Sequence, residues 1–344
     1  MSNKRRFIIG ICITIGFIGS IIGFNLYNKY IAENTKNRSK IYLYIPTGAV
    51  YQQVVDSINK NDFLKNPENF FKLADDRSLK TRIKPGKYPV TPGMNNRQIL
   101  NMLLAGNQEP VTIAFQNIRL KETFVGMVTK KLECDSVSLI KLLDSTAIAS
   151  KYGFTKNNIY TLFIPNSYEM FWNTSADKFV EKMHKEYLKF WNVNRLKKAE
   201  VLKLTPQEIS ILASIVDSEA LMDKEMPTIA GLYLNRLKRE IKLQADPTVI
   251  FANNDFTIRR VLFKHLKTQS PYNTYLNKGL PPGPISMPSI KAIDAVLNYE
   301  NHNYLYMCAK EDFSGYHNFA SNIAQHSINA KKFQQALNNR NIKK

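Results

Sequence analysis

One acidic side chain continues an apolar helix face that should be buried. Ile209, Leu212, Val216 and Glu219 are spaced three, four and three residues apart, so in a helix they share one face. A carboxyl group among apolar neighbours has a raised pKa, because desolvation disfavours its anion. A proton held near neutral pH is what a general acid needs. Glu219 is therefore the candidate catalytic acid; the alternative is that Glu219, in the last turn, simply reaches solvent.

The helix that must position Glu219 has a clear beginning. Thr205-Pro206-Gln207-Glu208 is a capping box with proline at the first helical position. Asp217 precedes Glu219 by two residues, which is about 200° around a helix, and should point elsewhere. A second helix is expected over residues 227–239, and a third over residues 289–298.

Amide, hydroxyl and aromatic side chains follow in a loop-rich tract over residues 242–287 and near the end of the chain. A long loop tract inside a compact region is more often a binding surface than a simple connection. Amides and hydroxyls bond to sugar hydroxyls, and aromatic rings cover sugar C–H faces, so this composition favours a carbohydrate ligand. The candidate binding residues are Gln244, Asp246, Thr248, Tyr272, Asn273, Thr274, Tyr275, His317 and Phe319.

Motifs for metals, cofactors and phosphates are missing from the sequence. The histidines and cysteines do not stand at metal-ligand spacing, the three cysteines form no CxxC pair, and there is no glycine-rich phosphate loop. We therefore expect neither a metal nor a cofactor. His317 and His326 are isolated, and isolated histidines are more often structural than catalytic.

A hydrophobic segment lies near the N-terminus. Phe7–Phe24 is 18 residues long without a charge, and as a helix it would span about 27 Å, enough for a hydrocarbon core. Basic residues precede it, as expected for a cytoplasmic N-terminus, but Lys29, Lys36, Arg38 and Lys40 follow it, so the charges alone orient it only weakly. The alternative is a cleaved signal peptide, but no small-x-small cleavage site follows the apolar run. We expect an uncleaved anchor over residues 7–27 after a cytoplasmic stub of residues 1–6.

The rest of the chain predicts an α+β protein with more than one domain. The length of 344 residues suits about two domains of roughly 150 residues each. A polar linker is expected over 28–40, a small α+β subdomain over 41–108 and a connecting α+β region over 109–204. A larger mixed α/β catalytic domain should occupy 205–340. The net charge of +20 suggests an anionic neighbour such as lipid headgroups, nucleic acid or a carboxylate-rich polymer.

Segments from Leu212 to Phe319 resemble the endolytic murein transglycosylase family (MltG, or YceG-like), and they occur in the family's order. The anchor also fits this family, and the small subdomain resembles the family's LysM-like subdomain. The matching segments are Leu212-Ala-Ser-Ile-Val-Asp-Ser-Glu-Ala220, Ile229-Ala-Gly-Leu-Tyr-Leu-Asn-Arg-Leu237, Leu243-Gln-Ala-Asp-Pro-Thr-Val-Ile250, Ser270-Pro-Tyr-Asn-Thr-Tyr275, Gly279-Leu-Pro-Pro-Gly283, Tyr304-Leu-Tyr306 and His317-Asn-Phe319.

The resemblance implies an activity and assigns residues to it. Glu219 would be the catalytic glutamate, Asp217 stands where relatives often carry Glu, and Asn235 and Arg236 join the binding candidates. The enzyme would cleave β-1,4 bonds between N-acetylmuramic acid and N-acetylglucosamine in nascent glycan strands, leaving 1,6-anhydro ends, without a cofactor. Its place would be the cytoplasmic (inner) membrane, single-pass, with the catalytic domain on the outer, periplasmic face. Glycan strands are the implied partner, and peptidoglycan synthases are candidate partners.

Three other readings stay open at this point. Asp246 is the obvious second carboxylate for a muramidase-type hydrolase, which needs a pair. A non-catalytic glycan-binding scaffold would need only the anchor and the LysM-like unit. A nucleic-acid binder is suggested by the net charge alone, and the anchor together with the terminal position of many basic residues argues against it.

Overall fold

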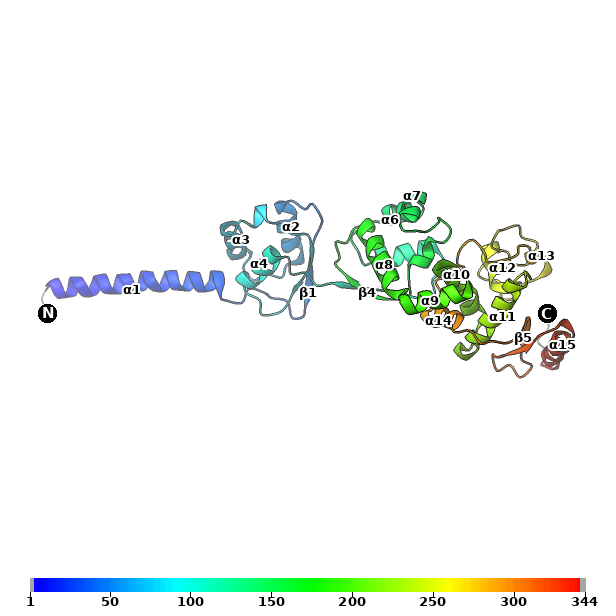
Figure 1. The fold of residues 1–344 in the computed structure, drawn as a ribbon. Coiled ribbons are helices and arrows are strands. Elements are labelled where there is room, and N and C mark those ends of the chain that lie inside the picture. Colours follow the sequence, from blue (N-terminus) through cyan, green and yellow to red (C-terminus); the bar gives the residue numbers. More distant parts are fainter. Residues whose placement is uncertain (1–2, 341–344) are drawn as a thin grey trace. The chain divides into compact units, whose positions relative to one another are not determined.

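The computed structural model describes residues 3–340 and is an α+β fold of helices and short strands (Figure 1). Residues 1–2 of the expected stub, and residues 341–344, lie outside the described residues. The chain forms two compact units. The first contains the chain up to Thr112 with residues 131–134 and 169–175, and the second contains 113–130, 135–168 and the chain from Ala176 on. Most of the region expected to connect two domains, 109–204, therefore belongs to the unit that carries Glu219.

The first unit is built on a two-stranded antiparallel sheet in which Leu43 of β1 lies opposite Tyr88 of β2. Alternation along β1 sends Leu43 and Ile45 into the core, where they meet Ile58 of α2 and Ile99 of α4. All five residues of β2 pair with β1. The elements of this unit are α1 Asn3–Tyr30, β1 Ile41–Ile45, α2 Tyr51–Asn61, α3 Pro67–Asp76, η1 Leu79–Thr81, β2 Gly86–Val90 and α4 Asn96–Ala105.

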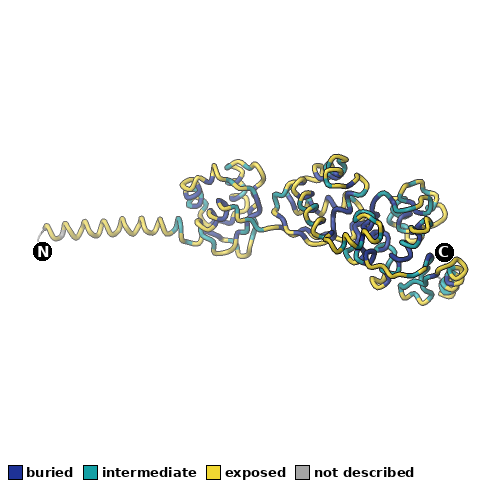
Figure 2. The backbone as a smooth tube through the Cα atoms, in the orientation of Figure 1, coloured by how far each residue is buried: buried dark blue, intermediate teal, exposed yellow. Residues whose placement is uncertain are grey.

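Helix α1 is long and apolar enough to cross a membrane by length and composition, with 24 residues from Phe7 to Tyr30 and a mean hydropathy of 2.4. Its side chains are exposed along most of its length (Figure 2). A helix of this kind near an N-terminus is also found in signal sequences.

The segment after α1 is not the free polar linker that was expected over residues 28–40. Asn34 and Thr35 are buried, and Thr35 forms a β-bridge with Leu64. The Asn34 amide donates to Asn96 Oδ1 at 2.6 Å, and its carbonyl oxygen accepts from the Asn66 amide nitrogen at 2.6 Å. Asn96 in turn donates to the Lys29 carbonyl in the last turn of α1. These buried hydrogen bonds fasten the end of α1 to the first unit.

The second unit is mainly helical, and α10 lies at its centre. α10 packs against α9, α11, α12 and α14. The elements of this unit are α5 Lys121–Thr129, α6 Ser136–Leu143, α7 Thr146–Lys151, η2 Ile159–Leu162, α8 Ala176–Phe190, α9 Val193–Leu202, α10 Pro206–Glu219, η3 Asp223–Glu225, α11 Met226–Lys238, α12 Asp246–Asn253, α13 Phe263–Leu266, α14 Ile290–Leu297, β5 Tyr306–Ala309, β6 His317–Ala320 and α15 Ile323–Asn339. β3 Val111–Phe115 and β4 Asn166–Met170 form a further two-stranded sheet.

The start of α10 follows the capping box read from the sequence. The Thr205 hydroxyl accepts from the Glu208 amide at 3.2 Å, and the Glu208 carboxylate accepts from the Thr205 amide at 2.8 Å. Beyond this first turn the helix is buried on all sides from Ile209 to Val216, not only along the expected stripe. The reason is that helices pack around it from several directions, and the small side chains of Ala213 and Ser214 allow their close approach.

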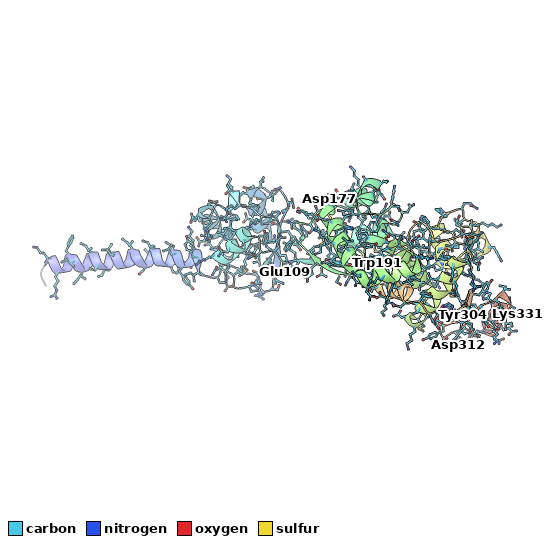
Figure 3. All side chains as sticks on the ribbon, in the orientation of Figure 1. Glu109, Asp177, Trp191, Tyr304, Asp312 and Lys331 are labelled. Atoms are coloured by element: carbon cyan, nitrogen blue, oxygen red, sulfur yellow. The ribbon has the colours of Figure 1, made fainter. Side chains whose placement is uncertain are left out.

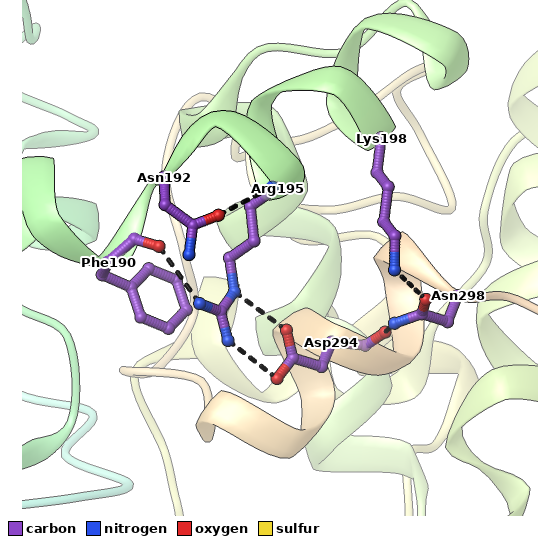
Figure 4. A network of polar contacts seen from close by, with 6 residues as sticks. All are labelled: Phe190, Asn192, Arg195, Lys198, Asp294 and Asn298. Atoms are coloured by element: carbon purple, nitrogen blue, oxygen red, sulfur yellow. Dashed lines mark hydrogen bonds and ion pairs between the residues drawn. The ribbon is translucent and has the colours of Figure 1, made fainter.

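A polar network fixes α14 to α9 (Figure 4). The Arg195 guanidinium donates two hydrogen bonds of 3.0 Å to the Asp294 carboxylate, and it also lies over the Phe190 ring. Lys198 donates to Asn298 at the end of α14. A bidentate arginine–carboxylate pair defines direction as well as distance, so α14 is held in a fixed orientation where it packs on α10.

The sequence missed three elements near the site. α12 and α13 lie inside the tract over 242–287 that was expected to be loop, and β6 pairs antiparallel with β5. β6 has the sequence HNFA, which offers little hydrophobic alternation. Its pairing with β5 brings Phe319 opposite Met307, and the Phe319 ring stacks on Tyr304 with the ring centres 5.5 Å apart. Tyr304 is labelled in Figure 3.

Candidate active site

Glu219 is the last residue of α10 and lines a pocket of about 270 Å³, which we call the Glu219 pocket. Its side chain is half-buried, so it faces this hollow and not open solvent. The pocket is formed by the end of α10, by α11, by the start of α12 and by the β5–β6 hairpin. Five of the residues expected at a binding site line the pocket with Glu219: Arg236, Gln244, Asp246, Tyr275 and His317.

The surroundings of Glu219 raise the pKa of its carboxyl group to about 7. The first cause is burial, which disfavours the anion, and the second is the negative charge of Asp246. Hydrogen bonds from Tyr233 and from the backbone of Asp246 oppose the shift. The Tyr233 hydroxyl donates to Glu219 Oε1 at 3.1 Å. The carboxyl group thus exchanges its proton close to neutral pH, as expected for a general acid that later acts as a base.

Asp246 is the first residue of α12 and not part of a loop, which corrects the expectation for this segment. A helix start is a favourable place for a carboxylate, because unpaired backbone N–H groups point toward it. The Tyr275 hydroxyl donates to Asp246 Oδ1 at 2.7 Å. Burial, and then this bond to Asp246, raise the pKa of Tyr275, so its hydroxyl keeps its proton and remains a donor. Asp246 is exposed on the pocket wall.

Arg236 uses most of its N–H donors in hydrogen bonds to backbone carbonyl groups of the protein. Its Nε donates to the Leu305 carbonyl at 2.6 Å, and its Nη1 donates to the Leu243 carbonyl at 2.7 Å. The residue is 6% exposed, so these carbonyls have little access to water. Arg236 therefore joins α11 to the non-helical segments that directly precede β5 and α12, and this holds two walls of the Glu219 pocket together.

His317 enters the pocket wall in a fixed orientation. Its Nδ1 lies 2.9 Å from Glu225 Oε2, and its backbone N–H donates to Glu225 Oε1 at 2.9 Å. Glu225 is 7% exposed and was not singled out from the sequence. An ionised carboxylate can only accept, so the ring proton lies on Nδ1 when Glu225 is charged. His326, the other isolated histidine, lies outside this pocket and stacks on Tyr306.

Six of the expected binding residues do not line the Glu219 pocket. Thr248 and Thr274 are buried and bond to each other at 2.8 Å, and the buried Asn273 amide donates to the Leu266 and Thr268 carbonyls. Asn235 donates to the His302 carbonyl at 2.7 Å. These four residues hold loops in place, because their polar groups are already used inside the protein. Phe319 packs on Tyr304, and Tyr272 lines a different hollow.

Tyr233 is the main residue that sequence reasoning missed. It is 2% exposed, and on α11 it reads as one more apolar core position. Only the packing of α11 against α10 brings its hydroxyl to Glu219, and no local pattern encodes that relation.

Asp217 behaves as expected and points elsewhere: it accepts from the Ser289 amide at 3.0 Å and from the Ser289 hydroxyl at 2.8 Å at the start of α14. Within residues 3–340 there is no group of three or more His, Cys, Asp and Glu side chains that could hold a metal ion.

The chain is similar over most of its length to curated proteins and to a solved structure. The curated endolytic murein transglycosylase of Bacillus subtilis (strain 168) is 27% identical over 92% of this chain and 91% of its own length. The protein of that name from Streptococcus pneumoniae serotype 2 (strain D39) is 22% identical over 95% of this chain, which spans 65% of that longer relative. A crystal structure of a yceG-like protein from Listeria monocytogenes shares the fold with a TM-score of 0.55, at 23% identity over 85% of this chain and 99% of that one.

The family profile described as YceG-like matches residues 43–332, which cover parts of both compact units and the whole Glu219 pocket. This match extends over far more than half of the 344 residues. The chain therefore belongs to the YceG-like family.

Proposed function

We propose that this protein is a lytic transglycosylase that cleaves the β-1,4 bonds between N-acetylmuramic acid and N-acetylglucosamine inside peptidoglycan strands. The observation that carries the proposal is the Glu219 carboxyl group, with a pKa raised to about 7 in a pocket that also contains polar and aromatic side chains. The curated relatives named endolytic murein transglycosylase support the same substrate and the same type of reaction.

In this mechanism one carboxyl group acts twice. Protonated Glu219 gives its proton to the glycosidic oxygen as the bond from that oxygen to C1 of N-acetylmuramic acid breaks. The resulting carboxylate then takes the proton of the C6 hydroxyl of the same sugar, whose oxygen attacks C1 and closes the 1,6-anhydro ring. Glu219 ends protonated, no water is consumed, and no cofactor is required. Tyr233 fits this cycle because its hydroxyl donates to Glu219 and stabilises the carboxylate between the two steps.

Product mass tests the proposal directly. Purified glycan strands digested with the full-length protein should give fragments whose new ends are each one water molecule lighter than a reducing end. Fragments with ordinary reducing ends would overturn the lytic mechanism and support hydrolysis. If no fragments formed at all, the result would instead favour the non-catalytic scaffold.

Hydrolysis is the second candidate, and one observation favours it. The negative charge of Asp246 is close enough to raise the pKa of Glu219, so two carboxyl groups share one site, as muramidase-type chemistry needs. In a hydrolase Asp246 would activate water or attack the sugar, whereas in a lytic enzyme its charge would only raise the pKa of Glu219. Asp246→Asn therefore separates the two: roughly a 10²-fold or larger loss of kcat indicates hydrolysis, and a loss below about tenfold indicates the lytic route.

Two substitutions should shift the pH profile in opposite directions. kcat/KM should fall as the pH rises above about 7, because Glu219 must start protonated. Asp246→Asn removes a charge that raises the pKa of Glu219, so this alkaline limb should move to lower pH. Tyr233→Phe removes a hydrogen bond that lowers the pKa, so the limb should move to higher pH. If both variants shift the limb in the same direction, the limb does not belong to Glu219.

We further propose that α1 anchors the protein in the cytoplasmic membrane, with the catalytic unit on the outer face. The apolar stretch of α1 supports the anchor. The orientation is supported by the location of the glycan strands outside the cytoplasm, and the basic residues before α1 are compatible with it. Glycan strands would then be reached close to where they are made, and peptidoglycan synthases are the natural neighbours. Recovery of the full-length protein in a salt-washed soluble fraction would refute the anchor.

A further inference from the structure

The second unit contains another pocket, of about 430 Å³, which shares no lining residue with the Glu219 pocket. We call it the Ser286 pocket. It lies between the segment from Ile118 to Glu122, the end of α12 and the segment from Ser270 to Met287. Nothing in the mechanism above uses it. The residues important here are Arg119, Lys156, Tyr160, Phe251, Tyr272 and Ser286.

Two hydroxyl groups of this pocket are not used by the fold. Ser286 is 4% exposed, and its Oγ has no hydrogen-bond partner among the described residues. The buried Oη of Tyr160 likewise lacks a partner within residues 3–340. Buried polar atoms are nearly always bonded, and an unbonded one costs about 1–3 kcal/mol. Burial raises the pKa of Tyr160, so its hydroxyl remains protonated and can donate. Both residues therefore have bonding capacity left for a ligand.

The charges at this pocket favour an anionic group. Arg119 and Lys156 are exposed, and neither belongs to an ion pair among the described residues. Lys121, also in the lining, is already neutralised by Asp144 at 2.7 Å. The lining also contains the carboxylate of Glu122, and Arg119 lies 5.7 Å from the centre of the Phe256 ring. The cations Arg119, Lys121 and Lys156 still outnumber Glu122 and Asp144, so the lining has a net positive charge that favours a carboxylate.

The other walls are apolar. The Phe251 and Tyr272 rings lie 4.7 Å apart, and Leu120 and Met287 also contribute to the lining. Such walls accept methyl groups and short aliphatic chains. A ligand with small apolar side chains, peptide groups and a free carboxylate would match all three features of the pocket.

A smaller hollow of about 70 Å³ is lined partly by residues of the Ser286 pocket and partly by residues next to Glu219 and Asp246 in the chain. It shares Arg119 and Phe251 with the Ser286 pocket. It is also lined by Ser218 and Pro247, the chain neighbours of Glu219 and Asp246. The small hollow therefore borders both the Ser286 pocket and the backbone segments that carry Glu219 and Asp246.

We propose that the Ser286 pocket binds the alanine-containing peptide carried by N-acetylmuramic acid, with a carboxylate of the peptide facing Arg119 and Lys156. The hydroxyls of Ser286 and Tyr160 bond to its carbonyl groups. This inference rests on the proposed function, because it takes peptidoglycan as the substrate. It makes the enzyme selective for strands that still carry their peptides.

The test compares peptide-bearing glycan strands with the same strands after an amidase has removed the peptides. Lys156→Glu and Arg119→Glu should lower kcat/KM on peptide-bearing strands roughly ten- to hundredfold, as loss of charge-assisted bonds predicts. Both variants should match wild type on bare strands. Lys197→Glu, an exposed charge reversal on α9 outside both pockets, is the control and should match wild type on both substrates.

Ser286→Ala and Tyr160→Phe separate binding from folding. Each removes a hydroxyl that the fold does not use, so the melting temperature should not fall, while activity on peptide-bearing strands should. Equal losses on both kinds of strand, or no loss on either, would overturn the inference.

Direct titration of the full-length protein with the soluble peptide L-alanyl-γ-D-glutamyl-L-lysyl-D-alanine makes the inference independent of cleavage. Binding that Lys156→Glu weakens, in a protein that cleaves nothing, would sink the proposed function and leave this inference standing. Cleavage of both strands at equal rates, without binding of the peptide, would do the reverse.

Discussion

Glu219→Gln is expected to lower kcat by roughly 10³-fold while leaving the fold intact. Glutamine has nearly the same shape and keeps a carbonyl oxygen that can accept from Tyr233, but it has no proton of suitable acidity to give. Initial rates on purified glycan strands measure this loss. Turnover close to wild type would show that another group protonates the leaving oxygen. Glu208→Gln is the matched control, because glutamine at this position of α10 preserves the capping box.

The same variant should also change how stability depends on pH. A carboxyl group whose pKa is raised on folding contributes stability below its unfolded pKa, and this contribution is lost as the pH rises through about 7. Glu219→Gln lacks this loss, so at pH 8 it should unfold with a free energy of the order of 1–3 kcal/mol higher than wild type. Denaturant titrations at pH 5 and pH 8 measure the difference. A variant that is less stable at both values would point to misfolding, and its low activity would then say nothing about catalysis.

Arg236→Lys is expected to lower the free energy of unfolding by about 2–4 kcal/mol. Lysine keeps the charge, but its single ammonium group cannot reach the carbonyls of Leu305 and Leu243 with the geometry of the guanidinium fork. At least one buried carbonyl would remain without a donor. Urea titration measures the loss, and Arg239→Lys, an exposed change one residue beyond the end of α11, should be nearly neutral.

The outcome also decides what Arg236 does. If Arg236 mainly bound substrate, as the sequence suggested, Arg236→Lys would raise KM and leave the unfolding curve unchanged. We expect instead that the loss of stability comes first, and that any change in KM follows from movement of the pocket walls.

Glu219 could be predicted because its position depends on one helix alone. A clear capping box fixes where α10 begins, and helical spacing then places Glu219 in line with Val216 and Leu212. The helices expected over residues 227–239 and 289–298 were predictable for the same reason, since each carries its own periodicity, and they correspond to α11 and α14. α12, which also lines the pocket, was not predicted.

The partners of Glu219 could be predicted only in part. Tyr233 meets Glu219 because two helices pack at a particular angle, which no single segment specifies. Amides and hydroxyls such as those of Asn273 and Thr274 are the side-chain types that bind sugars, but in this fold they bond to backbone groups of the protein. Residue type alone does not distinguish a group that holds a loop from one that waits for a ligand.

The buried bonds of Asn34 have a mechanical consequence for the proposed anchor. A disordered linker over residues 28–40 would let the first unit move away from the bilayer by about 20 Å. Because Asn34 is bonded to Asn96, and Asn96 to the last turn of α1, most of this movement is prevented. If α1 is the anchor, the first unit is then held close to the membrane surface, at a height that varies less than a disordered linker would allow.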